Sequence, residues 1–182
     1  MIVLTLIALL LLQLPRAVAL PLSFETPDEL KQVEPSGGLA ILERVRDHAS
    51  DGEWALRAVF PGSPTDTWPG FYLTFDAADL SSAPDIAFDV FAPGEAAAAI
   101  SWRLDDLEGR RVFGSAPLKA GETTAVSISL RALRRDLDLP RLRRLYVYVR
   151  MPRRDVELLF DNFRLADPLR GFRPVVHVPD RR

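Results

Sequence analysis

The chain has 182 residues, of which 48% are hydrophobic and 26% charged, a composition typical of a globular protein with a single core. Its formal net charge of −2 gives no bulk attraction to nucleic acid, so no nucleic-acid partner is expected. The chain contains no cysteine, which excludes disulfides, thiol catalysis and thiolate metal sites.

Residues 1–19 have the features of a cleaved secretory signal. An apolar run extends from Ile2 to Leu12, and the small residues of Ala17–Ala19 provide a signal-peptidase site. The run is shorter than the roughly 20 apolar residues that span a bilayer, and Pro15 follows it closely. We therefore expect a secreted or periplasmic protein without a membrane span after cleavage. The alternative is an uncleaved anchor.

Short segments of alternating apolar residues, separated by Gly and Pro turns, fill most of the remaining chain. They predict an all-β fold, a two-sheet antiparallel β-sandwich over residues 20–167, followed by a C-terminal tail at 168–182. Strands are expected near residues 21–25, 39–46, 54–60, 71–75, 85–92, 98–105, 110–117, 124–130, 144–151 and 156–165.

Two short helical segments complete the predicted fold. Thr26 is a suitable N-cap for a helix that begins at Pro27, and Glu29 completes a capping box. A second short turn is expected within residues 130–139, because Pro140 would end it.

In several predicted strands one of the two alternating sets of side chains is apolar. Since successive side chains of a strand point to opposite faces, the apolar set is expected to fill the space between the sheets. This predicted core consists of Ile86, Phe88, Val90, Ile100, Trp102, Leu104, Val126, Ile128, Leu130, Leu145, Val147 and Val149.

The sequence contains no recognisable catalytic constellation. Its two histidines, His48 and His177, lie in a predicted loop and in the tail, and no nucleophile-elbow motif occurs. Asp105 and Asp106 are adjacent, so on a strand they point to opposite faces and cannot work as an acid–base pair. We expect no enzymatic activity. A polysaccharide lyase or hydrolase on the same fold is the minor alternative.

Aromatic side chains opposite the core are candidates for sugar binding, because the C–H-rich face of a pyranose packs well on an aromatic ring. Trp54 and Trp102 are instead expected in the core. The candidate ligand-binding residues are Tyr146, Tyr148, Arg150, Tyr72 and Trp68. The alternative for each tyrosine is that it is simply a good strand former.

Arginines are dense between residues 131 and 154. Such a strip can bind an anionic partner, for example an acidic polysaccharide or a phosphorylated lipid headgroup. It can also be a solvated surface that neighbouring carboxylates balance. The spacing follows no single face, which favours the solvated surface.

The segment "ELLFDNFRLAD" carries Asp161 and Asn162 in the middle of an apolar strand. By alternation, Asp161 shares a face with Leu159 and Phe163, where an apolar side chain is normal. A carboxylate in that position needs either a cation or several hydrogen-bond donors.

Six segments occur in an order that resembles a known group of domains: "LSFETPDEL", "DHASDGEWALRAVF", "FDAADLSSAPDIAFDVFAP", "SWRLDDLEGR", "APLKAGETTAVSISLRAL" and "LLFDNFRL". Together they resemble the carbohydrate-binding-module-like, galactose-binding-like jelly-roll domains that are attached to glycoside hydrolases and occur in secreted bacterial proteins. The resemblance covers residues 22–166 and implies a non-catalytic module that binds a polysaccharide or glycan. Because one fold serves many functions, an envelope protein-interaction or assembly scaffold is the alternative.

The same resemblance implies a structural calcium ion where the first and last strands meet. By position, its ligands would be Glu25, Asp161 and the turn that contains Ser50 and Gly52. Carboxylate and carbonyl oxygens are the ligands that calcium prefers. The alternative is that an arginine or backbone N–H groups neutralise Asp161.

Overall fold

The computed structural model describes residues 20–38, 41–65, 67–75, 79–94 and 99–166. The predicted signal at 1–19 and the predicted tail at 168–182 lie outside the described residues. Within the described part of the chain, no helix has the length and apolar character that crossing a membrane requires.

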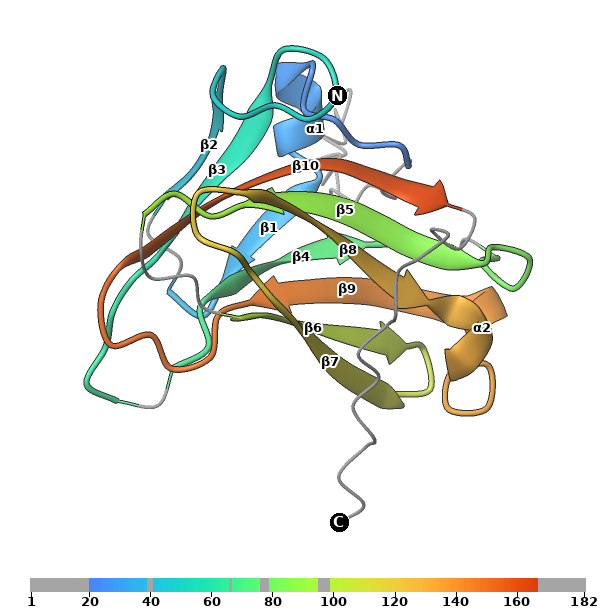
Figure 1. The fold of residues 1–182 in the computed structure, drawn as a ribbon. Helices are drawn as coiled ribbons and strands as arrows, with labels where there is room; N and C mark the ends of the chain where they lie inside the picture. The colour runs from blue at the N-terminus through green and yellow to red at the C-terminus, as the bar shows by residue number, and fades with distance from the viewer. Residues whose placement is uncertain (1–19, 39–40, 66, 76–78, 95–98, 167–182) are drawn as a thin grey trace, which may run out of the picture.

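Two antiparallel five-stranded sheets face each other, as predicted, and form a β-sandwich (Figure 1). The first sheet has the order β1 (Val33–Ser36), β4 (Gly70–Thr74), β9 (Leu142–Tyr148), β6 (Ala99–Asp106) and β7 (Arg111–Pro117). The second has the order β2 (Ile41–Val45), β3 (Ala55–Phe60), β10 (Val156–Ala166), β5 (Asp85–Phe91) and β8 (Thr123–Ser129).

The described helices are short. Helix α1 (Pro27–Leu30) begins after Thr26 with the predicted capping box. Helix α2 (Leu130–Leu133) and the 3-10 helix η1 (Leu139–Arg141) follow β8, so Pro140 lies inside a helical turn and does not end one.

The core lies between the two sheets and confirms the alternation. Every residue of the predicted core is buried in one continuous apolar cluster. Phenylalanine rings from both sheets meet at its centre, where Phe71 of β4 makes edge-to-face contacts with Phe160 and Phe163 of β10. Such contacts stabilise the packing beyond the apolar area they bury.

Two predictions about the N-terminal strands are wrong. Residues 21–25 form no strand; only Leu22 pairs, in an isolated bridge to Phe163. The strand β1 begins at Val33 instead, in a segment where no strand was expected. Proline is tolerated there because β1 is an edge strand, paired on one side only, with β4.

The predicted placement of Asp161 is also wrong, because a β-bulge interrupts β10. Phe160 and Phe163 both pack in the core although they are three residues apart, and the register with β5 shifts between them. Asn162 has a φ of 54°, a left-handed conformation that asparagine tolerates. The extra residue reverses the alternation. Asp161 therefore lies on the side of the second sheet away from the core, opposite Asp89.

Candidate functional site

The first sheet presents rows of polar and aromatic side chains on the face away from the core, which we call the outer face. Their sequence neighbours in each strand fill the core, so alternation directs these side chains outward. Each row crosses β4, β9, β6 and β7 in register. The central row is Tyr72, Tyr146, Arg103 and Phe113. One flanking row is Gly70, Tyr148, Ser101 and Ser115. The other flanking row is Thr74, Arg144, Asp105 and Arg111.

The three predicted tyrosines lie together on the outer face, but two of them are not exposed. The ring of Tyr146 stacks against Tyr72 at 4.3 Å and against Tyr148 at 4.8 Å between centroids. Tyr146 and Tyr148 are only 5% and 7% exposed, so neither ring offers an open face to a sugar. The expected exposure of these two rings is wrong, because Tyr146 is stacked between Tyr72 of the neighbouring strand and Tyr148 of its own strand. Tyr72 is half-buried.

Tyr146 connects the tyrosine stack to Trp68. Its hydroxyl donates a hydrogen bond to the carbonyl oxygen of Trp68, and the Trp68 side chain is 55% exposed. Gly70 makes room for this arrangement, because a Cβ at this position would lie 2.8 Å from the Tyr146 ring. Burial raises the pKa of Tyr146 and of Tyr148, so both phenols remain protonated donors at neutral pH.

A buried carboxylate holds two arginines of the outer face in place. Asp105, 3% exposed, accepts hydrogen bonds from Arg103 at 2.7 and 2.9 Å and from Arg144 at 2.7 Å. The Arg103 guanidinium lies 5.2 Å from the centroid of Tyr146, and that of Arg144 lies 4.5 Å from Tyr72. Burial lowers the pKa of Arg103, but the hydrogen bond and charge of Asp105 outweigh it and raise that pKa. The guanidinium groups are therefore charged and fixed in orientation.

Phe113 and Arg103 are the members of the central row that the sequence-based site omitted. Phe113 is 43% exposed at the β7 end of the row. The alternation in "RVFGSAP" places Phe113 with Arg111 on the face opposite Val112, so the signal was present. Arg150 lies just beyond the end of β9 and is exposed.

Trp54 does not lie in the core as predicted. It is half-buried immediately before β3, and the guanidinium groups of Arg44 and Arg46 lie 4.2 and 4.8 Å from its ring centroid. Arg44 also donates to the carbonyl oxygen of Phe24 at 2.5 Å, so this arrangement ties the N-terminal segment to β2. Trp102, in contrast, is in the core.

The residues predicted to bind calcium are brought together at the loop before β3. Asp161 accepts hydrogen bonds from the backbone N–H groups of Ser50 and Asp51 at 2.6 and 2.7 Å. Glu25 accepts from those of Glu53 and Trp54, both at 2.9 Å. The contacts of Asp161 are those of the alternative to calcium, in which backbone N–H groups neutralise this carboxylate.

The oxygens of the two carboxylates are thus directed at hydrogen-bond donors, which are backbone N–H groups for both and also the Ser50 hydroxyl for Asp161. A calcium ion needs oxygens that are free to coordinate it. Among the residues that the structure describes, no group of three or more His, Cys, Asp or Glu side chains is placed to hold a metal ion. As placed, these residues do not form the predicted oxygen cage, and calcium stays a prediction.

A scan of the sequence against protein-family models gives no match, and a search of curated proteins gives none. Solved structures do match. An exo-β-agarase shares 15% identity with a TM-score of 0.63, over 81% of this chain and 25% of the agarase. The family 11 carbohydrate-binding module of Clostridium thermocellum, in complex with a β-1,3-1,4-mixed-linked tetrasaccharide, shares 14% identity with a TM-score of 0.56, over 71% of this chain and 84% of the module.

A family 30 carbohydrate-binding module from a cellulosomal cellulase of Clostridium thermocellum shares 16% identity with a TM-score of 0.56, over 72% of this chain and 89% of the module. The chain thus spans about a quarter of the agarase but most of the length of each module. At these identities the likeness concerns the fold. The chain has the β-sandwich fold of carbohydrate-binding modules.

Proposed function

We propose that the chain is a secreted or periplasmic, non-catalytic module that binds a polysaccharide along the outer face of the first sheet. The observation that carries the proposal is the central row, in which Tyr72, Tyr146, Arg103 and Phe113 lie in register across four strands. Neighbouring strands lie about 4.8 Å apart, so the row is about 14 Å long. This length suits an extended saccharide chain better than a single sugar ring.

The chemistry of the outer face suits a saccharide. Two exposed rings, Phe113 at the β7 end of the central row and Trp68 in the loop before β4, offer apolar surfaces for the C–H faces of sugars. Between them, Arg103 and Arg144 present N–H donors to hydroxyl oxygens, and Asp105 fixes the direction of these donors. Donors that are already oriented lose little entropy on binding. Tyr146 supports this surface from below, whereas the sequence had suggested that it contacts the ligand itself.

The similar structures favour this function over the scaffold alternative. Two of them are carbohydrate-binding modules that match over most of their own length, and one is in complex with a tetrasaccharide. The polysaccharides to try first are therefore mixed-linkage β-glucan, xylan and agarose, which match the names of these structures and of a xylan-binding domain with a TM-score of 0.51.

Affinity gel electrophoresis of the purified chain against these polysaccharides tests the proposal. The variants Phe113→Ala and Tyr72→Ala should each lower the affinity for the retained polysaccharide by about tenfold, as expected for aromatic contacts in an interface. Leu107→Ala is the matched control, because Leu107 is 52% exposed in the β6–β7 turn and belongs to none of the rows.

Retention that both aromatic variants leave unchanged would rule out the outer face as the binding surface. Capture of an envelope protein without retention by any polysaccharide would favour the scaffold alternative. Release of reducing ends from any of these polysaccharides would contradict the non-catalytic assignment.

A further inference from the structure

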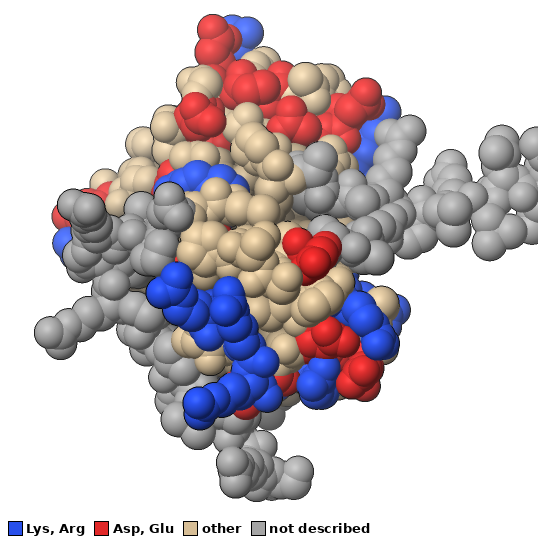
Figure 2. Space-filling view, turned by 90° about the vertical axis from the view of Figure 1, so that its right-hand side faces the viewer, with Lys and Arg blue, Asp and Glu red and all other residues tan. Residues whose placement is uncertain are grey.

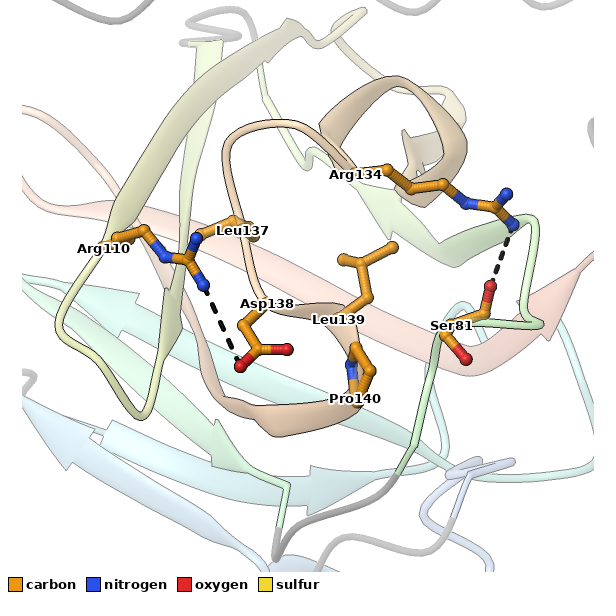
Figure 3. A pocket seen from close by; sticks show the side chains of 7 residues that line it. All are labelled: Ser81, Arg110, Arg134, Leu137, Asp138, Leu139 and Pro140. Carbon is orange, nitrogen blue, oxygen red and sulfur yellow. Dashed lines mark hydrogen bonds and ion pairs between the residues drawn. The ribbon is translucent and has the colours of Figure 1, made fainter.

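A pocket of about 560 Å³ lies at one end of the sandwich, between the β6–β7 turn, the segment that joins α2 to β9, and the loop before β5 (Figure 3). None of its lining residues belongs to the rows of the outer face. They are Ser81, Arg110, Arg134, Leu137, Asp138, Leu139 and Pro140.

Arg134 brings an unbalanced positive charge to this pocket. One nitrogen of its guanidinium donates to the carbonyl oxygen of Ser81 at 2.9 Å. Among the described residues, no carboxylate lies within ion-pair distance of Arg134 or of its exposed neighbours Arg131 and Arg135. Figure 2 looks onto the side of the molecule on which α2 lies and shows basic side chains in a continuous band.

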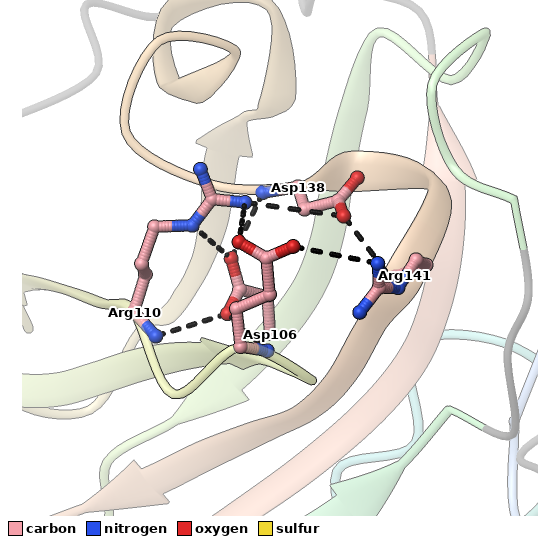
Figure 4. A network of polar contacts seen from close by, with 5 residues as sticks. Asp106, Arg110, Asp138 and Arg141 are labelled. Carbon is pink, nitrogen blue, oxygen red and sulfur yellow. Dashed lines mark hydrogen bonds and ion pairs between the residues drawn. The ribbon is translucent and has the colours of Figure 1, made fainter.

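Arg110 lies on the opposite side of the pocket from Arg134 (Figure 3), and it takes part in a network of polar contacts (Figure 4). Its Nε donates to the buried carboxylate of Asp106 at 2.7 Å, and its Nη2 lies 3.4 Å from Glu108 and 3.9 Å from Asp138. Asp138 also lies 3.6 Å from Arg141. Asp138 thus shares Arg110 and Arg141 with Asp106 and Glu108, so both of these arginines are already paired. Arg134 is the arginine of the pocket lining that has no carboxylate partner among the described residues.

We propose that this pocket binds an anionic saccharide unit, one that carries a carboxylate or a sulfate ester. The anionic group pairs with the guanidinium of Arg134, whose planar set of donors suits carboxylate and sulfate oxygens. Pro140 and the edges of Leu137 and Leu139 give the ring an apolar wall. The carboxylate of Asp138 is placed to accept a hydrogen bond from a ring hydroxyl, which separates a sugar from a bare anion.

The solvated-surface interpretation of the arginine-rich strip holds for Arg141, which is half exposed and pairs with Glu108 and Asp138. It does not hold for Arg134, which lines a cavity. The lining of this pocket shares no residue with the rows of the outer face. Failure of the proposed polysaccharide binding at the outer face would therefore not contradict the proposed site in the pocket, and the reverse is also true.

The test is a ¹H–¹⁵N NMR titration of the full chain with glucuronate, glucose and inorganic sulfate. Glucuronate should shift the amides of Ser81 and of residues 134–139, and glucose should leave them unchanged. Sulfate should bind at the same amides but more weakly, since it lacks the ring. Arg134→Gln should weaken glucuronate binding by about tenfold, the loss expected for a charge-assisted contact.

Arg131→Gln is the matched control, because Arg131 lies on α2, one turn before Arg134 at the C-cap of that helix, and is exposed and without an ion pair among the described residues, but does not line the pocket. Tyr72→Ala should also leave glucuronate binding unchanged, which separates this pocket from the outer face. An equal loss in Arg131→Gln would reduce the effect to general charge attraction and overturn the site. Equal affinities for sulfate and glucuronate would overturn the assignment to a saccharide, as would an equal response to glucose.

Discussion

Asp161 accepts hydrogen bonds from both the backbone N–H and the hydroxyl of Ser50, a residue 111 positions earlier in the chain. The Ser50 hydroxyl also lies 2.9 Å from the carboxylate of Asp89, the cross-strand partner of Asp161. The last strand thereby holds the loop before β3 against the second sheet. Burial raises the pKa of Asp161, and the backbone donors offset this only in part.

Replacing Asp161 by asparagine should destabilise the fold by about 1–3 kcal/mol, because an amide NH2 would then face backbone N–H donors in a buried site. Urea unfolding at pH 7 measures the loss. Glu157→Gln on the same strand is the control. Glu157 pairs with Arg57 at a partly exposed position, so its loss should stay below about 1 kcal/mol. Equal losses in the two variants would contradict a specific role for Asp161.

The predicted calcium ion is tested by thermal melts in buffer, with a chelator, and with added calcium. Because the oxygens of Asp161 and Glu25 already accept backbone N–H groups, we expect the chelator to leave Tm unchanged. A fall in Tm that added calcium reverses and magnesium does not would instead support the calcium site. The Asp161→Asn variant should then lose that response.

The sequence was sufficient to predict most of the core and most strand faces, because a period of two leaves few alternatives in a two-sheet fold. The exception in the core is Trp54, which lies outside it. The prediction of faces failed at Asn162, where one residue in a left-handed conformation shifts the register. Alternation cannot reveal a bulge by itself, although an Asp-Asn pair in an apolar strand is a useful sign of one. The edge strand β1 was hidden for a related reason, since Pro35 is also a turn residue.

The candidate site was predicted only in part, for a different physical reason. Alternation placed Tyr72, Tyr146 and Tyr148 correctly on the face away from the core. Exposure, however, depends on neighbours from other strands, and the stacking of three rings across β4 and β9 is not visible in either segment alone. Phe113 was missed because its place in the row follows from the β6–β7 pairing.

Asp106 should make stability depend on pH in the acid range (Figure 4). Burial raises the pKa of this carboxyl, but hydrogen bonds from the backbone of Asp138 and Arg110, with the charge of Arg110, outweigh burial and lower it. A carboxyl whose pKa is lowered in the folded state stabilises the fold, and this stabilisation is fully present above the unfolded-state pKa of about 3.9. The stabilisation is lost as the pH falls through the folded-state pKa.

The variant Asp106→Asn should therefore be less stable than the parent at pH 7, and this difference should shrink as the pH falls below about 4. Urea unfolding between neutral and acid pH gives both curves. Glu108→Gln is the control in the same turn, because Glu108 is partly exposed and its pairs with Arg110 and Arg141 are 3.4 Å long. A difference between Asp106→Asn and the parent that stays constant with pH would contradict the expected ionisation.

Gly52 and Gly121 form a matched pair that isolates the contact between the loop and Glu25. Both have a left-handed backbone, with φ of +74° and +71°. Alanine should therefore cost about 1–2 kcal/mol at either position from backbone strain alone. A Cβ at Gly121 would meet no atom within 4 Å, whereas a Cβ at Gly52 would overlap the Glu25 carboxylate. Glu25 can move away only by giving up its hydrogen bonds from Glu53 and Trp54.

Gly52→Ala should accordingly be less stable in urea than Gly121→Ala by about 0.5–1.5 kcal/mol, the net contribution of a typical hydrogen bond, because these donors are exposed and can turn to water. The double variant Gly52→Ala with Glu25→Ala removes the overlap together with the hydrogen bonds. If the Glu25 contact is the cause, adding Gly52→Ala to Glu25→Ala should cost no more than Gly121→Ala costs in the parent, since only strain remains. Equal losses for the two single glycine variants would mean that Glu25 does not hold the loop.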